Sequence, residues 1–166
     1  MRLIITIPVI ILLTGCFLMP YSFTGSSVPS HIKTIAIPLF DDQSGSGEPG
    51  LREKLTNKLI ERFRQDNSLE IADKTQADSI VEGIILSLPD QPNVVSKGET
   101  VTKRRVTINV KVLYQDLKLK KKVFDKQFSQ WGDYEIGAGP AQRQSGIDAA
   151  IEKLTEDILR ETVSGW

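Results

Sequence analysis

The stretch RVTINVKVLY, residues 105–114, constrains the fold of this 166-residue chain more than any other feature. Apolar residues stand at every second position in it, with the polar Thr107, Asn109 and Lys111 between them: Val106, Ile108, Val110, Val112 and Tyr114. Because successive side chains of a strand point to opposite faces, this alternation predicts a strand with one buried and one solvated face. Such a strand is typical of an antiparallel sheet.

The neighbouring segments predict the rest of the sheet. DLKLKKK supplies a basic turn after the first strand, and VFDKQFSQW is expected to run back as its hairpin partner. Shorter strands are expected in IKTIAIPLF, LEIAD and ADSIVEGIILSLP. In IKTIAIPLF, period two places Ile35, Ile37 and Leu39 on one face. Residues 41–50 and 90–99 are rich in loop-forming residues and are expected to be polar loops.

Two amphipathic helices are expected beside this sheet. In LREKLTNKLIERF the apolar residues lie four apart: Leu51, Leu55, Leu59 and Phe63. A second stripe closes the sequence: Ile147, Ile151, Leu154 and Ile158. This spacing buries one stripe of each helix and leaves its charged residues in water.

The expected element order is therefore β-α-β-β-β-β-α. Both helices can cover the apolar face of one sheet, which predicts an α+β fold: a two-layer sandwich with a mostly antiparallel or mixed sheet of four to five strands. Residues 32–166 are expected to form this single domain, because a chain of that length can bury a sufficient core without disulfides.

The N-terminus predicts a secretory signal. Arg2 precedes an almost unbroken apolar run over residues 3–13, and that run is too short to cross a bilayer, which needs about 20 residues. Small residues then lead to Cys16, the only cysteine. We therefore expect residues 1–15 to be a signal peptide and residues 16–31 to be a tether. An uncleaved signal anchor or a buried free cysteine is the alternative.

Leu13-Thr14-Gly15-Cys16 resembles the bacterial lipobox. The resemblance implies that Cys16 carries covalent diacylglycerol and an N-linked acyl chain, and no other cofactor is expected. Two or three fatty chains make such an anchor effectively permanent. Residue 17 is Phe and not the Asp that tends to retain enterobacterial lipoproteins at the inner membrane. This favours the periplasmic side of the outer membrane.

The remaining residues offer no catalytic or metal-binding set. His31, the only histidine, lies in the tether, and adjacent Asp41 and Asp42 fit a solvated loop better than a metal site. Glu82 is expected at an edge or facing solvent. Lys plus Arg and Asp plus Glu both number 21, so the cationic excess that nucleic-acid binding needs is missing. We interpret the protein as a non-enzymatic binding or structural protein.

Two basic groups lie at opposite ends of the long strand, roughly 43 Å apart at about 3.3 Å per residue, so they do not form one site. Lys103, Arg104 and Arg105 open the strand, and four lysines follow it: Lys118, Lys120, Lys121 and Lys122. Charged turns and strand ends keep edges soluble. The functional alternative is that one group binds the phosphates of an anionic lipid.

Several segments together resemble the LptE family of lipopolysaccharide-assembly lipoproteins: the lipobox, YSFTGSS, HIKTIAIPLF, EPGLREKLTNKLIERF, ADSIVEG and RVTINVKV. The resemblance implies a non-catalytic lipoprotein that plugs the outer-membrane β-barrel LptD, supports its assembly and binds lipopolysaccharide. Family members are thought to use basic residues for that binding. On chemistry alone, we assign it to the four lysines named above.

A second resemblance keeps another class open. TIAIPLFDDQSGSG followed by a long helix is also similar to the opening of outer-membrane lipoproteins that activate peptidoglycan synthases or build secretion channels. Such proteins would contact an enzyme or form oligomers and would not fill a barrel.

Overall fold

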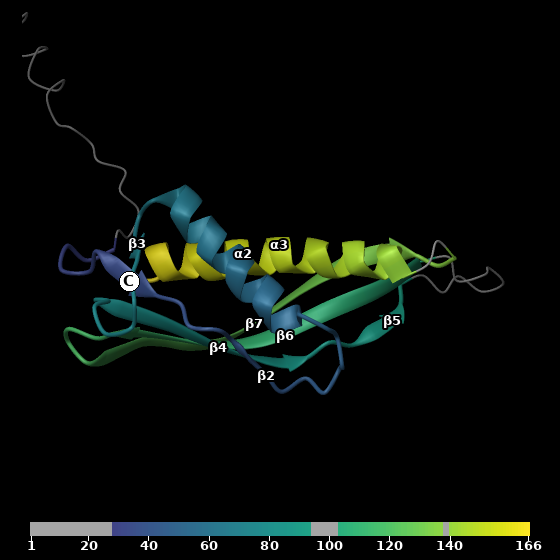
Figure 1. Ribbon diagram of the computed structural model, residues 1–166, viewed down its shortest axis with the longest axis horizontal. Helices are drawn as coiled ribbons and strands as arrows, with labels where there is room; N and C mark the ends of the chain where they lie inside the picture. The colour runs from purple at the N-terminus through teal and green to yellow at the C-terminus, as the bar shows by residue number, and fades with distance from the viewer. Residues whose placement is uncertain (1–27, 94–102, 138–139) are drawn as a thin grey trace, which may run out of the picture.

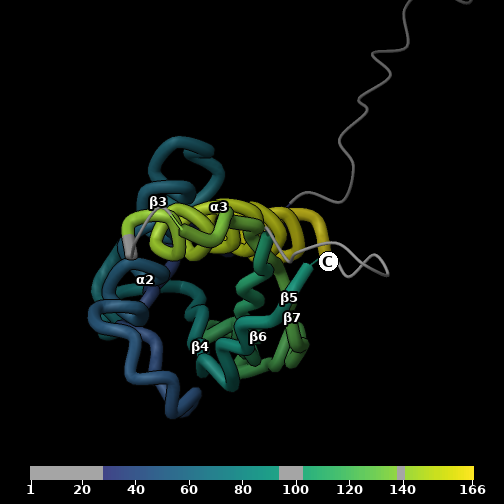
Figure 2. Tube along the Cα trace, turned by 90° about the vertical axis from the view of Figure 1, so that its right-hand side faces the viewer, coloured from purple at the N-terminus to yellow at the C-terminus, as the bar shows by residue number. Residues whose placement is uncertain are grey.

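The computed structural model describes residues 28–93, 103–137 and 140–166. In this part of the chain, helices α2 (Leu51–Asp66) and α3 (Pro140–Ser164) lie on one side of a single mixed sheet (Figure 1). Viewed end-on, α3 lies over β6 and β7, whereas α2 lies beside it (Figure 2). The predicted α+β class, with two helices on a sheet, is confirmed.

The sheet of the described residues contains seven strand segments: β1 (Thr34–Ala36), β2 (Asp41–Asp42), β3 (Glu70–Ile71), β4 (Ser79–Ser87), β5 (Asp90–Pro92), β6 (Lys103–Asp116) and β7 (Lys121–Glu135). β1 and β2 both pair with β4 in parallel, and β4 and β5 both pair with β6 in antiparallel. β1 and β2 therefore share one position in the sheet, and β4 and β5 share another. The seven segments make a sheet that is five strands wide, in agreement with the predicted four to five strands.

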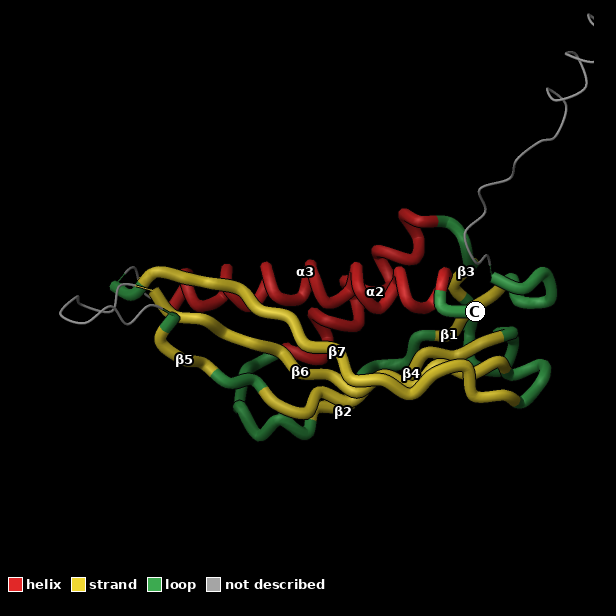
Figure 3. The backbone as a smooth tube through the Cα atoms, turned by 180° about the vertical axis from the view of Figure 1, so that it is seen from behind, coloured by secondary structure: helices red, strands yellow, loops and turns green. Residues whose placement is uncertain are grey.

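The β6–β7 hairpin is the longest element of the sheet. The five apolar side chains of β6 that alternate in the sequence are all fully buried: Val106, Ile108, Val110, Val112 and Tyr114. The apolar stripes of α2 and α3 close over this face, with Leu55, Leu59 and Leu154 completely excluded from solvent. The core thus lies between the helices and one face of the sheet, and the other face carries no helix (Figure 3).

The first strand corrects the sequence interpretation. Ile35 and Ile37 are buried as expected, but Leu39 is 52% exposed and Phe40 is buried in its place. Pro38 lacks an N–H donor, and the N–H of Phe40 donates to Thr56 Oγ1 of α2 at 3.1 Å. The chain therefore leaves the sheet between β1 and β2, and the alternation shifts by one residue.

Two predicted loops contain short strands. Asp41–Asp42 and Asp90–Pro92 extend the lines of β1 and β4 as β2 and β5. The backbone of β2 pairs with β4, and the backbone of β5 pairs with β6. Side chains that are typical of loops do not prevent this pairing, because the hydrogen bonds are made by backbone groups.

The expected signal peptide (1–15), Cys16 and most of the expected tether lie outside the described residues. Among the described helices, neither combines the length and the apolarity that a membrane span requires.

Candidate functional site

The four lysines that the sequence singled out lie in the turn between β6 and β7 and at the start of β7. Lys120, Lys121 and Lys122 are exposed, and Lys120 has a left-handed backbone with φ 51°. Leu119 beside them is 65% exposed. Asp116 fixes the turn, because its Oδ1 accepts a hydrogen bond of 2.8 Å from the N–H of Leu119. We call Lys120, Lys121 and Lys122 the lysine turn.

Lys118 has a different position from the lysine turn. Its Nζ lies 2.8 Å from Asp78 Oδ1 and donates to the carbonyl oxygen of His31 at 2.7 Å. All four predicted lysines are exposed, but Lys118 differs from the other three because it binds both Asp78 and the backbone at His31.

The end of the expected tether is fixed at this same place. His31 Nε2 lies 2.7 Å from Oδ2 of the buried Asp116. Asp78 Oδ2 accepts hydrogen bonds from the backbone N–H groups of Lys33 at 2.8 Å and Thr34 at 3.1 Å. With Lys118 also bound to His31, the described chain begins at the end of the sheet that carries the lysine turn. β1 and β3 lie at this end (Figure 3).

Both carboxylates of this junction favour the ionised form. The hydrogen bond from Lys118, together with the backbone N–H groups, lowers the pKa of Asp78 from 3.8 to about 2. Burial, the largest influence on Asp116, acts to raise its pKa, but the hydrogen bonds from His31 and the N–H of Leu119 outweigh it and lower that pKa.

We expect stability to fall in acid because of Asp78. Since its folded-state pKa lies below its ordinary 3.8, its contribution is present at neutral pH and is lost as the pH falls from about 4 towards 2. Urea unfolding of the wild type and Asp78→Asn across this range measures the effect. The stability difference between them should shrink as the pH falls. A constant difference would show that ionisation of Asp78 does not matter.

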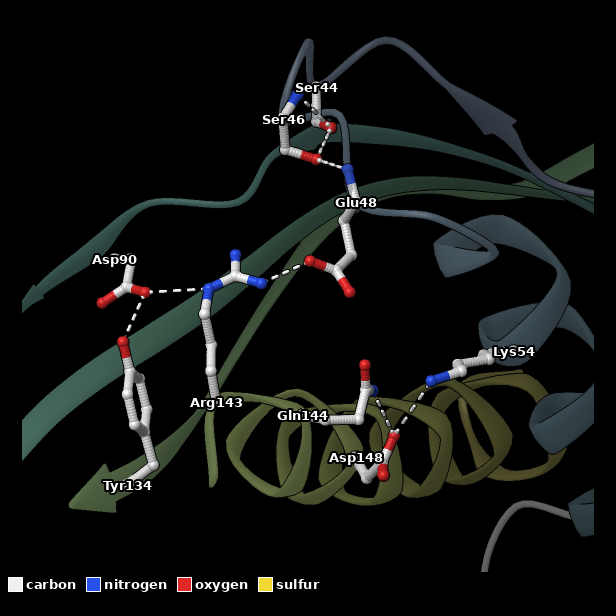
Figure 4. A network of polar contacts seen from close by, with 9 residues as sticks. All are labelled: Ser44, Ser46, Glu48, Lys54, Asp90, Tyr134, Arg143, Gln144 and Asp148. Carbon is white, nitrogen blue, oxygen red and sulfur yellow. Dashed lines mark hydrogen bonds and ion pairs between the residues drawn. The ribbon is translucent and has the colours of Figure 1, made fainter. Parts of the chain in front are cut away.

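At the opposite end of the hairpin, Arg104 joins a charge-matched network around Asp90 of β5, and Figure 4 shows the part of it formed by Tyr134, Arg143 and Glu48. Arg104 Nε and the Tyr134 hydroxyl each donate to Asp90 at 2.7 Å, and Arg143 Nε donates at 3.1 Å. Arg143 also pairs with Glu48. Burial acts most strongly on Asp90 and would raise its pKa, but these hydrogen bonds lower it. The network holds the loop before α2 against the start of α3.

Arg105 at this end is also occupied. It donates to both carboxylate oxygens of Asp133 at 2.7 and 2.9 Å, and it lies 4.9 Å from the centre of the Trp131 ring. By contrast, Lys120 and Lys121 make no ion pair within the described residues. An incoming anion therefore finds unoccupied donors at Lys120 and Lys121, whereas at Arg104 and Arg105 it must displace a carboxylate. Lys103, the remaining member of the basic group at the arginine end, is exposed and makes no ion pair within the described residues.

The other residues that the sequence raised have structural roles. Asp41 and Asp42 accept hydrogen bonds from Gln43 and from the N–H of Ser44, which shape the following turn. Glu82 faces solvent, as expected, and pairs with Lys74 at 2.8 Å. Across residues 28–93, 103–137 and 140–166, no group of three metal-ligating side chains is assembled.

These features define a small α+β protein with a basic turn at the end where its N-terminal segment joins the domain. The lipopolysaccharide-assembly family model, LptE, matches residues 32–164. The chain therefore belongs to the LptE family, the non-catalytic outer-membrane lipoproteins of lipopolysaccharide assembly.

Solved structures of low identity share the fold. The hypothetical protein CT253 of Chlamydia trachomatis is 9% identical, with a TM-score of 0.62 over 78% of this chain and 95% of that one. Lipoprotein B of Nitrosomonas europaea is 10% identical, with a TM-score of 0.58 over 89% and 92%. The PelC dodecamer of Paraburkholderia phytofirmans is 12% identical, with a TM-score of 0.53 over 84% and 95%. No curated protein matches the chain in sequence.

Proposed function

We propose that this protein plugs an LptD-type β-barrel of the outer membrane, anchored by lipid on Cys16, and binds lipopolysaccharide as that lipid passes to the outer leaflet. Membership of the LptE family supports the barrel partner and the ligand. The lysine turn, with ammonium groups that no carboxylate of the described residues fully neutralises, is the observation that carries the binding site.

The ligand chemistry follows from the turn. Lipopolysaccharide carries phosphate groups, and each exposed lysine near an anionic lipid surface contributes about 1 kcal/mol at low salt. The turn lies where the described chain begins, so a lipid anchor on the preceding segment and the phosphate-binding lysines belong to one end of the domain. Lys118 supports this site indirectly, because it holds the chain at His31 in place.

We expect the triple variant Lys120→Gln, Lys121→Gln, Lys122→Gln to bind lipopolysaccharide about a hundredfold more weakly at low salt, because three phosphate donors are removed. Fluorescence titration with purified lipopolysaccharide measures this. The control removes the same charge from exposed positions of α2, Arg52, Lys54 and Arg64, and should retain affinity. Unchanged affinity of the turn variant with an unchanged melting temperature would assign the turn to solubility.

The partner is identified by purifying the full-length lipoprotein from its native membrane. A β-barrel of LptD size in equal amount supports the proposal. A peptidoglycan synthase would contradict it, and so would a ring of identical copies. Native mass spectrometry tests the ring directly by measuring the number of copies in the purified assembly, since the PelC dodecamer has a similar fold.

A further inference from the structure

We propose that Leu119 inserts into the anionic lipid surface on which the protein is anchored, while the lysine turn binds the phosphates around it. This inference rests on the proposed function, which places a lipid on Cys16, and it names a membrane partner for the same turn. Leu119 is 65% exposed, more than any other large apolar side chain of the described residues. We call Leu119 and the lysine turn together the membrane tip.

A buried carboxylate holds the membrane tip in place. Asp116 is only 2% exposed, and its two oxygens bind different segments of the chain. Oδ1 accepts the N–H of Leu119 at 2.8 Å, and Oδ2 lies 2.7 Å from His31 Nε2. The N–H of Leu117 also donates to the carbonyl oxygen of Asp78 at 2.8 Å. Because these bonds fix the backbone of the turn, they hold Leu119 in its exposed position.

The charges around Leu119 favour a negatively charged partner. Lys120 and Lys121 make no ion pair within the described residues, and Lys122 lies 3.7 Å from its carboxylate partner, Asp125. A single exposed leucine would not by itself indicate a partner. A leucine beside unoccupied ammonium groups, however, matches the boundary of an anionic bilayer, where phosphates lie next to acyl chains.

The carboxylate side chains at this end do not cancel the charge of the turn. Both carboxylates of the junction are already bound, by Lys118 and by His31. Glu70 and Asp73 are exposed, but they line a hollow beside β3. Because β1 and β4 lie between β3 and β6, this hollow is roughly 14 Å from the hairpin at about 4.8 Å per strand.

The chain joins the domain beside the membrane tip, and this identifies the lipid surface. The carbonyl oxygen of His31 accepts a hydrogen bond of 2.7 Å from Lys118, the residue next to Leu119. The start of the described chain (purple) and the turn between β6 and β7 (green) lie at the same end in Figure 1. His31 follows Cys16 by fifteen residues, which span at most about 50 Å. A lipid on Cys16 therefore keeps the tip close to the bilayer, and a tethered contact needs little affinity of its own.

The opposite end of the hairpin lacks this combination. Ile136 is 49% exposed there and Lys103 is also exposed, but Arg104 and Arg105 are bound by carboxylates. The fourteen steps along β7 place that end roughly 46 Å from the tip at about 3.3 Å per residue. Ile136 and Lys103 are therefore matched controls for Leu119 and the lysine turn.

The first test measures the reactivity of single lysines in the full-length lipoprotein. The protein is added to preformed vesicles of equal parts phosphatidylglycerol and phosphatidylcholine, its exposed lysines are acetylated, and mass spectrometry gives the extent at each. We expect Lys120 and Lys121 to react several-fold more slowly than in neutral detergent, while Lys103 keeps its reactivity. Leu119→Asn should restore the reactivity of the turn, because insertion no longer holds it at the phosphates. Ile136→Asn should leave the shielding unchanged.

The outcomes separate this inference from the proposed function. Shielding that survives Leu119→Asn would mean that the lysines bind phosphates without insertion, and the inference would be wrong. Shielding that requires added lipopolysaccharide would assign the turn to that ligand alone, so the proposed function would stand without the membrane tip. Shielding in detergent that rises with protein concentration would indicate a second copy and would also overturn the inference. No shielding by either lipid would contradict both proposals.

A second measurement reports the depth of the tip. Because Cys16 is the only cysteine and carries lipid in the proposed function, Leu119→Cys offers one free thiol for a nitroxide label. In the same vesicles this label should be accessible to oxygen and protected from a water-soluble nickel chelate, and the same label on Ile136→Cys should show the reverse. Equal accessibility at the two positions would overturn the insertion of Leu119. Labelling of two thiols would show that Cys16 is free, and the anchor of the proposed function would then fail instead.

Discussion

Changing Cys16 to serine is expected to abolish lipid attachment and to leave an unprocessed precursor. A thiolate is a far better nucleophile than a hydroxyl for alkylation by diacylglycerol, so Cys16→Ser removes the acceptor without a large change in size. Each buried methylene contributes about 0.8 kcal/mol to anchoring, and two or three chains are lost together. Metabolic labelling with a fatty acid, followed by mass spectrometry of the N-terminal peptide, measures the effect.

The control for this experiment is Ser26→Ala, which lies outside the lipobox and should leave labelling and processing intact. Normal labelling of Cys16→Ser would place the lipid elsewhere and would remove the basis for an anchored protein. Loss of labelling together with loss of outer-membrane fractionation would support both the attachment and the location.

The fold could be predicted from the sequence wherever one periodicity was long and uninterrupted. β6 alternates over ten residues, and α2 repeats Leu at every fourth position, so their buried faces were correctly predicted. The prediction for the first strand was wrong at Leu39. Pro38 has no N–H to donate and the N–H of Phe40 donates to Thr56 of α2, and these two features decide that Phe40 and not Leu39 faces the core. That choice depends on a residue in another element.

The candidate site was predictable only in part, for a related reason. Exposed charge is visible in the sequence, and Lys120, Lys121 and Lys122 are exposed. The partners of Lys118 cannot be recognised in the sequence, because Asp78 and His31 are distant from it in the chain and come close to it only in the folded protein. The arginine end shows the same effect on a longer scale, because Glu48 and Arg143 are 95 residues apart in the chain.

Gly132→Ala is expected to be the most destabilising single methyl addition in the described domain. The closest approach of α3 to β7 involves backbone on both sides: a Cβ on Gly132 would lie 1.9 Å from the carbonyl oxygen of Gly146. Beyond Gly146 towards the C-terminus, polar pairs hold α3 to β7, including Gln130 with Asp157 at 2.5 Å and Lys153 with the carbonyl oxygen of Trp131 at 2.9 Å. The helix therefore cannot move away without breaking contacts, and we expect a loss of about 3 kcal/mol in the free energy of unfolding.

Two other glycine-to-alanine variants are the controls for this prediction. In Gly146→Ala the nearest atoms are side-chain carbons of Tyr134 and Val106 at 3.1 and 3.2 Å, which can adjust, and alanine favours the helix by up to about 1 kcal/mol. Gly45→Ala meets no atom within 4 Å but has φ +64°, which costs about 1 kcal/mol. Urea unfolding should thus rank Gly132→Ala far below both. Equal stability of the three variants would mean that α3 does not pack closely on β7 at Gly132, and it would contradict the two-layer packing described above.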